Sequence, residues 1–114
     1  MLTIFGISNC DKCRATRKWF ADRGSAHQFH DLRKDGLTSA LVSDWLERLD
    51  VDTLINKRGK TWREIPQATR EKLTPNVASE LILNNPTLTK RPLIDTGSEL
   101  LVGYDEELWN NLKL

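Results

Sequence analysis

Two cysteines separated by two residues are the side chains in this sequence best suited to chemistry. Cys10-Asp11-Lys12-Cys13 follows a short apolar segment and precedes a helical pattern. A cysteine at a helix N-terminus faces unpaired backbone N–H groups and the positive end of the helix dipole, which favour thiolate over thiol. One turn further on, Cys13 could attack a mixed disulfide formed at Cys10. The motif therefore predicts thiol–disulfide exchange, with Cys10 attacking and Cys13 resolving.

The elements around the motif form a strand–helix–strand pattern. Residues 2–7 are apolar and partly β-branched, which predicts a buried strand. Ser8 or Asn9 could cap the helix that begins at residue 11, and Gly24 provides a left-handed stop. Residues 27–32 predict a second strand, so the segment has the size of a βαβ unit. Cys10 then lies at the carboxyl end of the first strand, where such units bind ligands.

The middle of the chain is predicted to be helical. Leu41, Val42, Trp45, Leu46 and Leu49 form an apolar stripe, in a helix opened by Thr38 or Ser39. A weaker turn at residues 54–55 and a polar loop at residues 56–60 follow. Two further helices are expected to start near Pro66 and Pro75, and Pro86 ends the second.

The last part of the chain returns to strands. Residues 92–95 and 99–103 predict two strands joined by a turn at residues 96–98, and residues 105–112 predict a closing helix. The order is thus βαβ, then helices, then ββα. Trp19, Trp45 and Trp109 lie at apolar helical positions and are expected to pack in the core.

Composition narrows the classes of function. The chain has 114 residues and a formal net charge of +1, which suits one globular domain and gives no argument for nucleic-acid or membrane binding. Its apolar runs are short, and the first residues do not resemble a signal peptide. We therefore expect a cytoplasmic protein, in which closely spaced cysteines indicate redox or metal chemistry more than a structural disulfide.

Two other interpretations of the cysteines stay open. They could be small buried hydrophobic residues. They could also bind zinc together with His27 and His30, but two residues between the histidines is shorter than the usual finger spacing. An odd offset on one strand would also point the two histidines to opposite faces. We predict no metal site.

Two basic segments are candidate binding elements. Residues 56–63 hold Lys57, Arg58, Lys60 and Arg63. This segment is either a solvated loop or a binding site for a carboxylate or another anion. Lys90-Arg91-Pro92 precedes a predicted strand. From the residues alone, the proline could simply start that strand in the trans form, and Arg91 could be a solvated charge.

The sequence resembles the arsenate reductase (ArsC-like) family, in particular its YffB and Spx branches. The matching segments are residues 3–10, residues 54–59 with Trp62 and Arg63, and residues 90–94. The resemblance implies an α/β fold of thioredoxin-like type, with a four-stranded mixed sheet. It also implies one domain over residues 1–114, with a helical insertion at about 38–86.

The resemblance also assigns roles to residues. It implies that Cys10 is the redox-active nucleophile, that Pro92 is cis and borders Cys10, and that Arg91 helps to bind the anion or substrate. Arsenate reductases of this type surround the cysteine with three arginines. Arg91 matches one, Asn56 with Lys57 and Arg58 lies near the second, and residues 101–104 carry none.

We therefore predict a thiol–disulfide oxidoreductase, with glutathione as co-substrate and no bound cofactor. The alternatives are a Spx-like redox-sensing regulator that binds RNA polymerase, or an arsenate reductase. The protein is expected to be a monomer, and the pKa of Cys10 is expected to lie below that of Cys13. The catalytic residues would be Cys10 and Cys13, and substrate would be bound by Asn9, Lys12, Asn56, Arg58, Arg91 and Pro92.

Overall fold

The computed structural model describes residues 2–112, which form two compact units. The first unit combines the chain up to Asp31 with the chain from Arg91 onward, and it is built on a sheet. The second unit, Leu32–Lys90, is helical and contains the predicted insertion at 38–86. None of the helices in the described part of the chain is long and apolar enough to cross a membrane.

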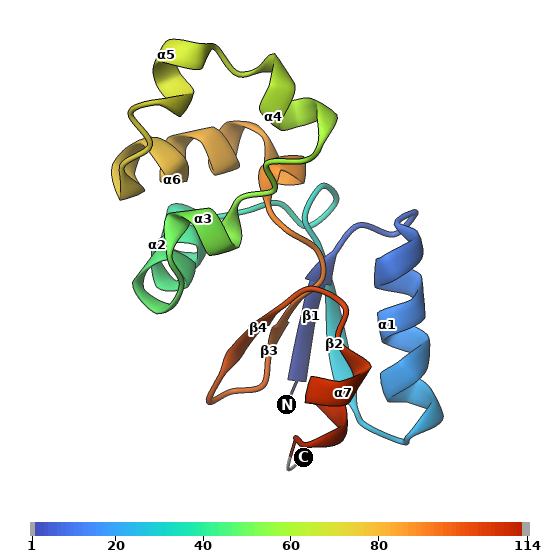
Figure 1. The fold of residues 1–114 in the computed structure, drawn as a ribbon. Helices are drawn as coiled ribbons and strands as arrows, with labels where there is room; N and C mark the ends of the chain where they lie inside the picture. The colour runs from blue at the N-terminus through green and yellow to red at the C-terminus, as the bar shows by residue number, and fades with distance from the viewer. Residues whose placement is uncertain (1, 113–114) are drawn as a thin grey trace. The chain divides into compact units, whose positions relative to one another are not determined.

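The sheet of the first unit has four strands in the order β2-β1-β3-β4 (Figure 1). The strands β1 and β2 are parallel, whereas β1–β3 and β3–β4 are antiparallel. The predicted mixed four-stranded sheet is therefore confirmed. Each strand is slightly shorter than the sequence pattern indicated: β1 is Leu2–Gly6, β2 is His27–Asp31, β3 is Leu93–Asp95 and β4 is Leu100–Val102.

Two helices complete the first unit, α1 (Asp11–Asp22) and α7 (Glu106–Asn110). Trp19 from α1 and Trp109 from α7 meet edge to face, with ring centroids 5.3 Å apart. Both indoles are buried, as their helical spacing predicted. Burying large aromatic side chains together with strand residues gives the unit most of its apolar core. That core consists of Leu2, Ile4, Trp19, Phe20, Ile94 and Trp109.

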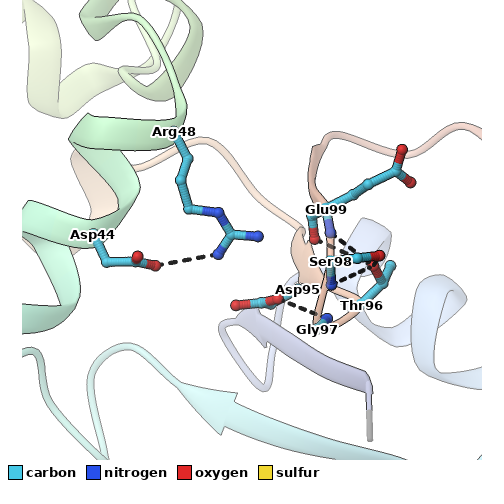
Figure 2. Close-up of polar contacts among 7 residues, drawn as sticks. All are labelled: Asp44, Arg48, Asp95, Thr96, Gly97, Ser98 and Glu99. Atoms are coloured by element: carbon cyan, nitrogen blue, oxygen red, sulfur yellow. Dashed lines mark hydrogen bonds and ion pairs between the residues drawn. The ribbon is translucent and has the colours of Figure 1, made fainter.

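The predicted hairpin between β3 and β4 is present, and side chains fix its turn (Figure 2). The Asp95 carboxylate accepts a hydrogen bond of 2.9 Å from the backbone N–H of Gly97, and the Thr96 hydroxyl accepts one of 3.0 Å from that of Glu99. Gly97 has φ +98°, a conformation that glycine adopts at little cost.

The second unit consists of short helices, and its longest two follow the sequence pattern. Thr38 caps the first helix by accepting a 3.1 Å hydrogen bond from Leu41 N–H, and an ion pair of 3.2 Å joins Asp44 to Arg48 one turn apart (Figure 2). Pro75 is the first residue of the second of these helices, α6 (Pro75–Asn84), as predicted. The helices are α2 (Ser39–Arg48), α3 (Val51–Leu54), α4 (Lys60–Glu64), α5 (Gln67–Arg70), α6 (Pro75–Asn84) and the 3₁₀ turn η1 (Pro86–Leu88).

The structure corrects the expected loop at residues 56–60 in part. A bend covers residues 57–59, but Lys60 already begins the short helix α4. Ile55, expected in a weak turn, pairs with Thr89 as an isolated β-bridge. Helix α4 buries none of its residues, so the sequence carries no apolar stripe that would reveal it.

Candidate active site

Cys10 lies where β1 passes into α1, at the N-cap position of the helix. Its backbone is extended (φ −94°, ψ 124°), its N–H donates to Ile7 C=O at 3.1 Å, and its C=O accepts from Arg14 N–H at 2.9 Å. Neither Ser8 nor Asn9 caps the helix, so that expectation was wrong. The cysteine itself occupies the cap, which places its sulfur beside the unpaired N–H groups of the first turn.

The surroundings of Cys10 favour its thiolate. Burial raises the pKa of the Cys10 thiol, but hydrogen bonds from the backbone N–H and the thiol of Cys13 lower it. The guanidinium of Arg91 and the backbone N–H of Lys12 act in the same direction, and the net pKa lies below its ordinary value. Because the thiolate is the nucleophilic form, Cys10 has the chemistry expected of the attacking cysteine.

Cys13 has the opposite properties. Its side chain is fully buried, and burial raises the pKa of its thiol to about 11, although the Ile7 N–H acts against this. Hydrogen bonding and charge repulsion from Cys10 raise that pKa further. The expected order of the two pKa values is therefore confirmed. At neutral pH, Cys13 is a protonated thiol that donates a hydrogen bond to the Cys10 sulfur.

A glycine makes room for the buried thiol. A Cβ atom added to Gly6 would lie 2.5 Å from the Cys13 sulfur and 3.1 Å from its Cβ. Real Cβ contacts are essentially never that short, so the last residue of β1 must lack a side chain for Cys13 to take this position. Sequence reasoning did not single out Gly6, since nothing local shows which side chain approaches it.

Arg91 and Pro92 reach the site from the start of β3. The bond between them is cis, as the family resemblance implied. Pro92 is buried, and its C=O accepts a 2.8 Å hydrogen bond from Gly103 N–H. Arg91 is half-buried and donates a hydrogen bond to the Cys10 sulfur. The sequence-predicted residues Cys10, Cys13, Arg91 and Pro92 thus belong to one unit, and the first three interact.

A buried carboxylate holds the loop before Cys10, and sequence reasoning missed it. One oxygen of Asp31 accepts hydrogen bonds from the Ser8 N–H at 3.0 Å and the Ser8 hydroxyl at 2.6 Å. Asp31 is 4% exposed and ends β2, in register with Gly6 at the end of β1. The only signal in the sequence was an acidic residue at a strand end, beside the edge that carries Cys10.

The remaining predicted binding residues are differently placed. Asn9 and Lys12 flank Cys10 with exposed side chains. Asn56 and Arg58 lie in the second unit, where the Asn56 amide oxygen accepts a 3.0 Å hydrogen bond from the Arg58 N–H. Arg58 is exposed. A role of these four residues in binding substrate stays a prediction.

Over residues 2–112, no three His, Cys, Asp or Glu side chains are grouped as metal ligands would be. Both cysteines are free thiols. His27 lies 3.2 Å from Ser25 C=O through its Nδ1, and the His30 ring packs 5.1 Å from that of Phe5. The histidines considered as zinc ligands therefore have other surroundings.

A four-stranded mixed sheet with a cysteine at the N-cap of the helix after its first strand is the arrangement of the thioredoxin-like fold. The sequence model of the ArsC family matches residues 5–112. The chain belongs to the ArsC family.

Known relatives cover almost the whole chain. A protein of uncharacterised function from Haemophilus influenzae is 36% identical over 107 residues, 94% of each chain. The global transcriptional regulator Spx of Listeria innocua is 27% identical, over 94% of this chain and 82% of its own.

Solved structures agree with the fold. A YffB protein superposes with a TM-score of 0.91 at 28% identity, over 96% of both chains. An arsenate reductase (ArsC) related protein from Brucella melitensis has a TM-score of 0.80 at 33% identity, over 97% of this chain and 95% of its own.

Proposed function

We propose that this protein is a thiol–disulfide reductase that uses Cys10 as nucleophile and glutathione as co-substrate. The observation that carries the proposal is the contrast between the two thiols. The pKa of Cys10 is lowered by four donors, whereas that of the buried Cys13 is raised to about 11. The sulfur of Cys10 therefore has more thiolate character than an ordinary cysteine, whereas that of Cys13 retains its proton at neutral pH.

The exchange proceeds in two balanced steps. The Cys10 thiolate attacks the glutathionyl sulfur of a mixed disulfide, so that a Cys10–glutathione disulfide forms and the substrate leaves as a thiolate that takes a proton from water. A second glutathione, as thiolate, then attacks the adduct. This step releases oxidised glutathione and restores the Cys10 thiolate. In net terms, one reduced glutathione is oxidised in each turnover: the glutathionylated substrate becomes a free thiol, and oxidised glutathione leaves.

Cys13 provides a second route by which the Cys10–glutathione disulfide can be resolved. After losing its proton, its sulfur could attack the sulfur of Cys10, form an intramolecular disulfide and expel glutathione. Burial and the high pKa of Cys13 make this branch slow at neutral pH. We infer that Cys13 acts chiefly as a hydrogen-bond donor to Cys10 and resolves the adduct only slowly.

The groups that would bind glutathione carry positive charge or polar donors. Arg91 can hold a carboxylate through paired, charged hydrogen bonds. Asn9 and Lys12 flank the nucleophile, and Pro92 shapes the wall beside it. We also assign Asn56 and Arg58 of the second unit to this function. We propose that the protein acts as a monomer in the cytoplasm, where glutathione is abundant.

The test is mass spectrometry of the protein after exposure to oxidised glutathione. We expect one glutathione on Cys10 within minutes, and slow conversion of the adduct to an internal disulfide. In the Cys13→Ser variant, the adduct should persist until reduced glutathione is added. Absence of any adduct at Cys10 would overturn the proposal. An internal disulfide that forms as fast as the adduct would show that Cys13 is the main resolving group.

A second candidate is a redox-sensing regulator. The match to Spx covers 94% of this chain, and Spx is a transcriptional regulator by name. In that case, the cysteine pair would serve as a switch, and the protein would bind RNA polymerase. Purification of tagged protein from cells, with and without an oxidant, discriminates between the two. Recovery of RNA polymerase without turnover of glutathionyl substrates would favour the regulator.

A further inference from the structure

Helix α1 carries an excess of positive charge, as does the segment 57–63 in the second unit. Residues 11–23 hold five basic side chains, Lys12, Arg14, Arg17, Lys18 and Arg23, against the two acidic residues Asp11 and Asp22. That segment therefore carries an excess of three positive charges, while the whole chain has a net charge of only +1. The chain as a whole is almost neutral, whereas this helix attracts anions.

Part of this charge lines a hollow. An open depression of about 310 Å³ is formed by Arg14, Arg17, Lys18 and Ala21 of α1 and by His27 of β2. The α1 residues recur at intervals of three and four and therefore share one helix face. Helix α1 runs beside β2 in the first unit, so this face is bordered by the edge strand of the sheet (Figure 1).

The row of side chains leads to the nucleophile. Cys10 is four residues before Arg14, so it continues the same row at the N-terminal end of the helix. Long side chains on a helix lean toward its N-terminus, which is the Cys10 end. A chain lying along this face would therefore pass the cationic hollow and reach Cys10.

The cations on this face are available to a partner. Arg17 stacks on the Phe29 ring, with its guanidinium carbon 4.3 Å from the ring centroid, and this contact leaves its N–H groups free to meet a carboxylate. Arg14 pairs with Asp11, and Lys18 pairs with Asp22 at 2.7 Å. Both pairs are exposed, and such pairs contribute little stability, so carboxylates of a partner can replace them.

We propose that the face made by Arg14, Arg17, Lys18 and His27 binds an acidic segment of a protein whose cysteine carries the disulfide attacked by Cys10. This rests on the proposed function and adds the substrate class. The eight residue steps from Cys10 to Lys18 span about 12 Å, which an extended chain covers in about four residues. The acidic residues should therefore lie within about four positions of the substrate cysteine.

A polypeptide suits this surface better than a nucleic acid. The cations of this face lie on one flank of one helix about three turns long, whereas phosphate backbones are bound by basic surfaces that extend over many phosphates. The edge strand β2 also offers backbone groups to an extended peptide.

The test compares two synthetic peptides that each contain a glutathionylated cysteine. In the first peptide four Glu residues flank the cysteine on each side, and in the second four Gln residues do. We expect Cys10 to react with the Glu peptide about tenfold faster at low salt, because opposite charges raise the encounter rate. The difference should disappear at about 0.5 M salt, where charges are screened within a few ångströms. It should also be lost in Arg17→Glu and survive in Lys72→Glu, a matched charge reversal at an exposed site in the second unit.

The uncharged hydroxyethyl disulfide provides the control for Cys10 itself. Its reaction rate should be equal in the native protein and in Arg17→Glu, since it uses no charge on α1. Equal rates for the Glu and Gln peptides at low salt would overturn the docking surface while leaving the proposed function intact. Failure of every disulfide to react would instead overturn the proposed function. Tighter binding of a short single-stranded DNA than of the Glu peptide would reassign the face to nucleic acid and also overturn the proposal.

Discussion

At the scale of single residues, the site depends on a difference between two identical functional groups. Cys10 and Cys13 are one helical turn apart, yet one lies at the helix N-cap and the other is fully buried. Burial alone raises the pKa of both thiols, so the direction of the shift at Cys10 is decided by its donors. Position relative to the helix end therefore decides which sulfur reacts.

This contrast predicts the pH dependence of alkylation. With iodoacetamide, the native protein should be modified at Cys10 first, and the midpoint of the pH–rate profile should lie below pH 9, the ordinary pKa of a thiol. Replacement of Cys13 by Ala removes one donor to the sulfur and should move this profile to higher pH. Tryptic peptide mapping identifies the modified cysteine. Faster modification of Cys13 at neutral pH would reverse the roles.

Gly6 provides a second residue-scale prediction. The Cβ of Gly6→Ala would meet the Cys13 sulfur at 2.5 Å, and overpacking of this kind costs about 1–3 kcal/mol. Displacement of the Cys13 thiol should also raise the pKa of Cys10, which loses a donor. Urea unfolding and the alkylation profile measure the two effects.

A double-mutant cycle separates the contact from other effects of the substitution. In a Cys13→Ala background, the sulfur is absent and Gly6→Ala should cost less, although the 3.1 Å approach to the Cβ of residue 13 remains. An equal cost in both backgrounds would mean that the sulfur contact is not what requires glycine.

At the scale of elements, strand ends position the nucleophile. The loop from β1 to α1 is tied to the end of β2 by the two hydrogen bonds between Ser8 and Asp31. The parallel pairing of β1 and β2 brings this carboxylate to the edge where Cys10 lies. Arg91 arrives at the start of β3, the other neighbour of β1. Three strands thus supply the groups around one sulfur.

We predict that Asp31 positions Cys10 through Ser8. Asp31→Asn retains an oxygen that can accept both hydrogen bonds, whereas Asp31→Leu removes both and Ser8→Ala removes one. Hydrogen bonds to a charged group are worth about 1.5–3 kcal/mol, so Ser8→Ala should lower the free energy of unfolding by that order. The pKa of Cys10 should rise in Asp31→Leu and be largely restored in Asp31→Asn. A fall of equal size in both variants would point to the charge of Asp31, because loss of a nearby negative charge favours the thiolate, and no change would point to a purely structural role.

Several elements could be predicted because their apolar side chains recur at the spacing of a strand or a helix. The apolar run of β1 and the spacing of Trp19 and Phe20 identified the strand and helix that flank Cys10, and the stripe through Trp45 identified α2. Helix α4 was missed because it buries no residue, and the cap of α1 was misassigned because Ser8 turns its hydroxyl to Asp31 instead. Contacts between residues far apart in sequence leave no local pattern to find.

At the scale of the whole molecule, the candidate active site is built from segments on both sides of the helical unit in the sequence. Cys10, Cys13 and Asp31 precede the helical unit and Arg91 follows it. The cis form of Pro92 and the predicted role of Arg91 came from the family resemblance, since the residues alone favoured a trans proline and allowed a solvated arginine. The placement of Asn56 and Arg58 in the helical unit raises the question of whether that unit also takes part in binding glutathione.

Alanine substitutions in the two units answer this question. Arg91→Ala should raise the KM for a glutathionylated peptide about tenfold, because a charged hydrogen bond is lost. It should also raise the pKa of Cys10, since the guanidinium is one of the donors to that sulfur.

Arg58→Ala should raise KM only a few-fold, as expected for an exposed charge, and leave kcat and the pKa of Cys10 unchanged. Lys72→Ala, an exposed position in the same unit, is the control and should change neither. If Arg58→Ala behaves like Lys72→Ala, the helical unit contributes no charge to glutathione binding, and recognition rests on the groups of the first unit alone.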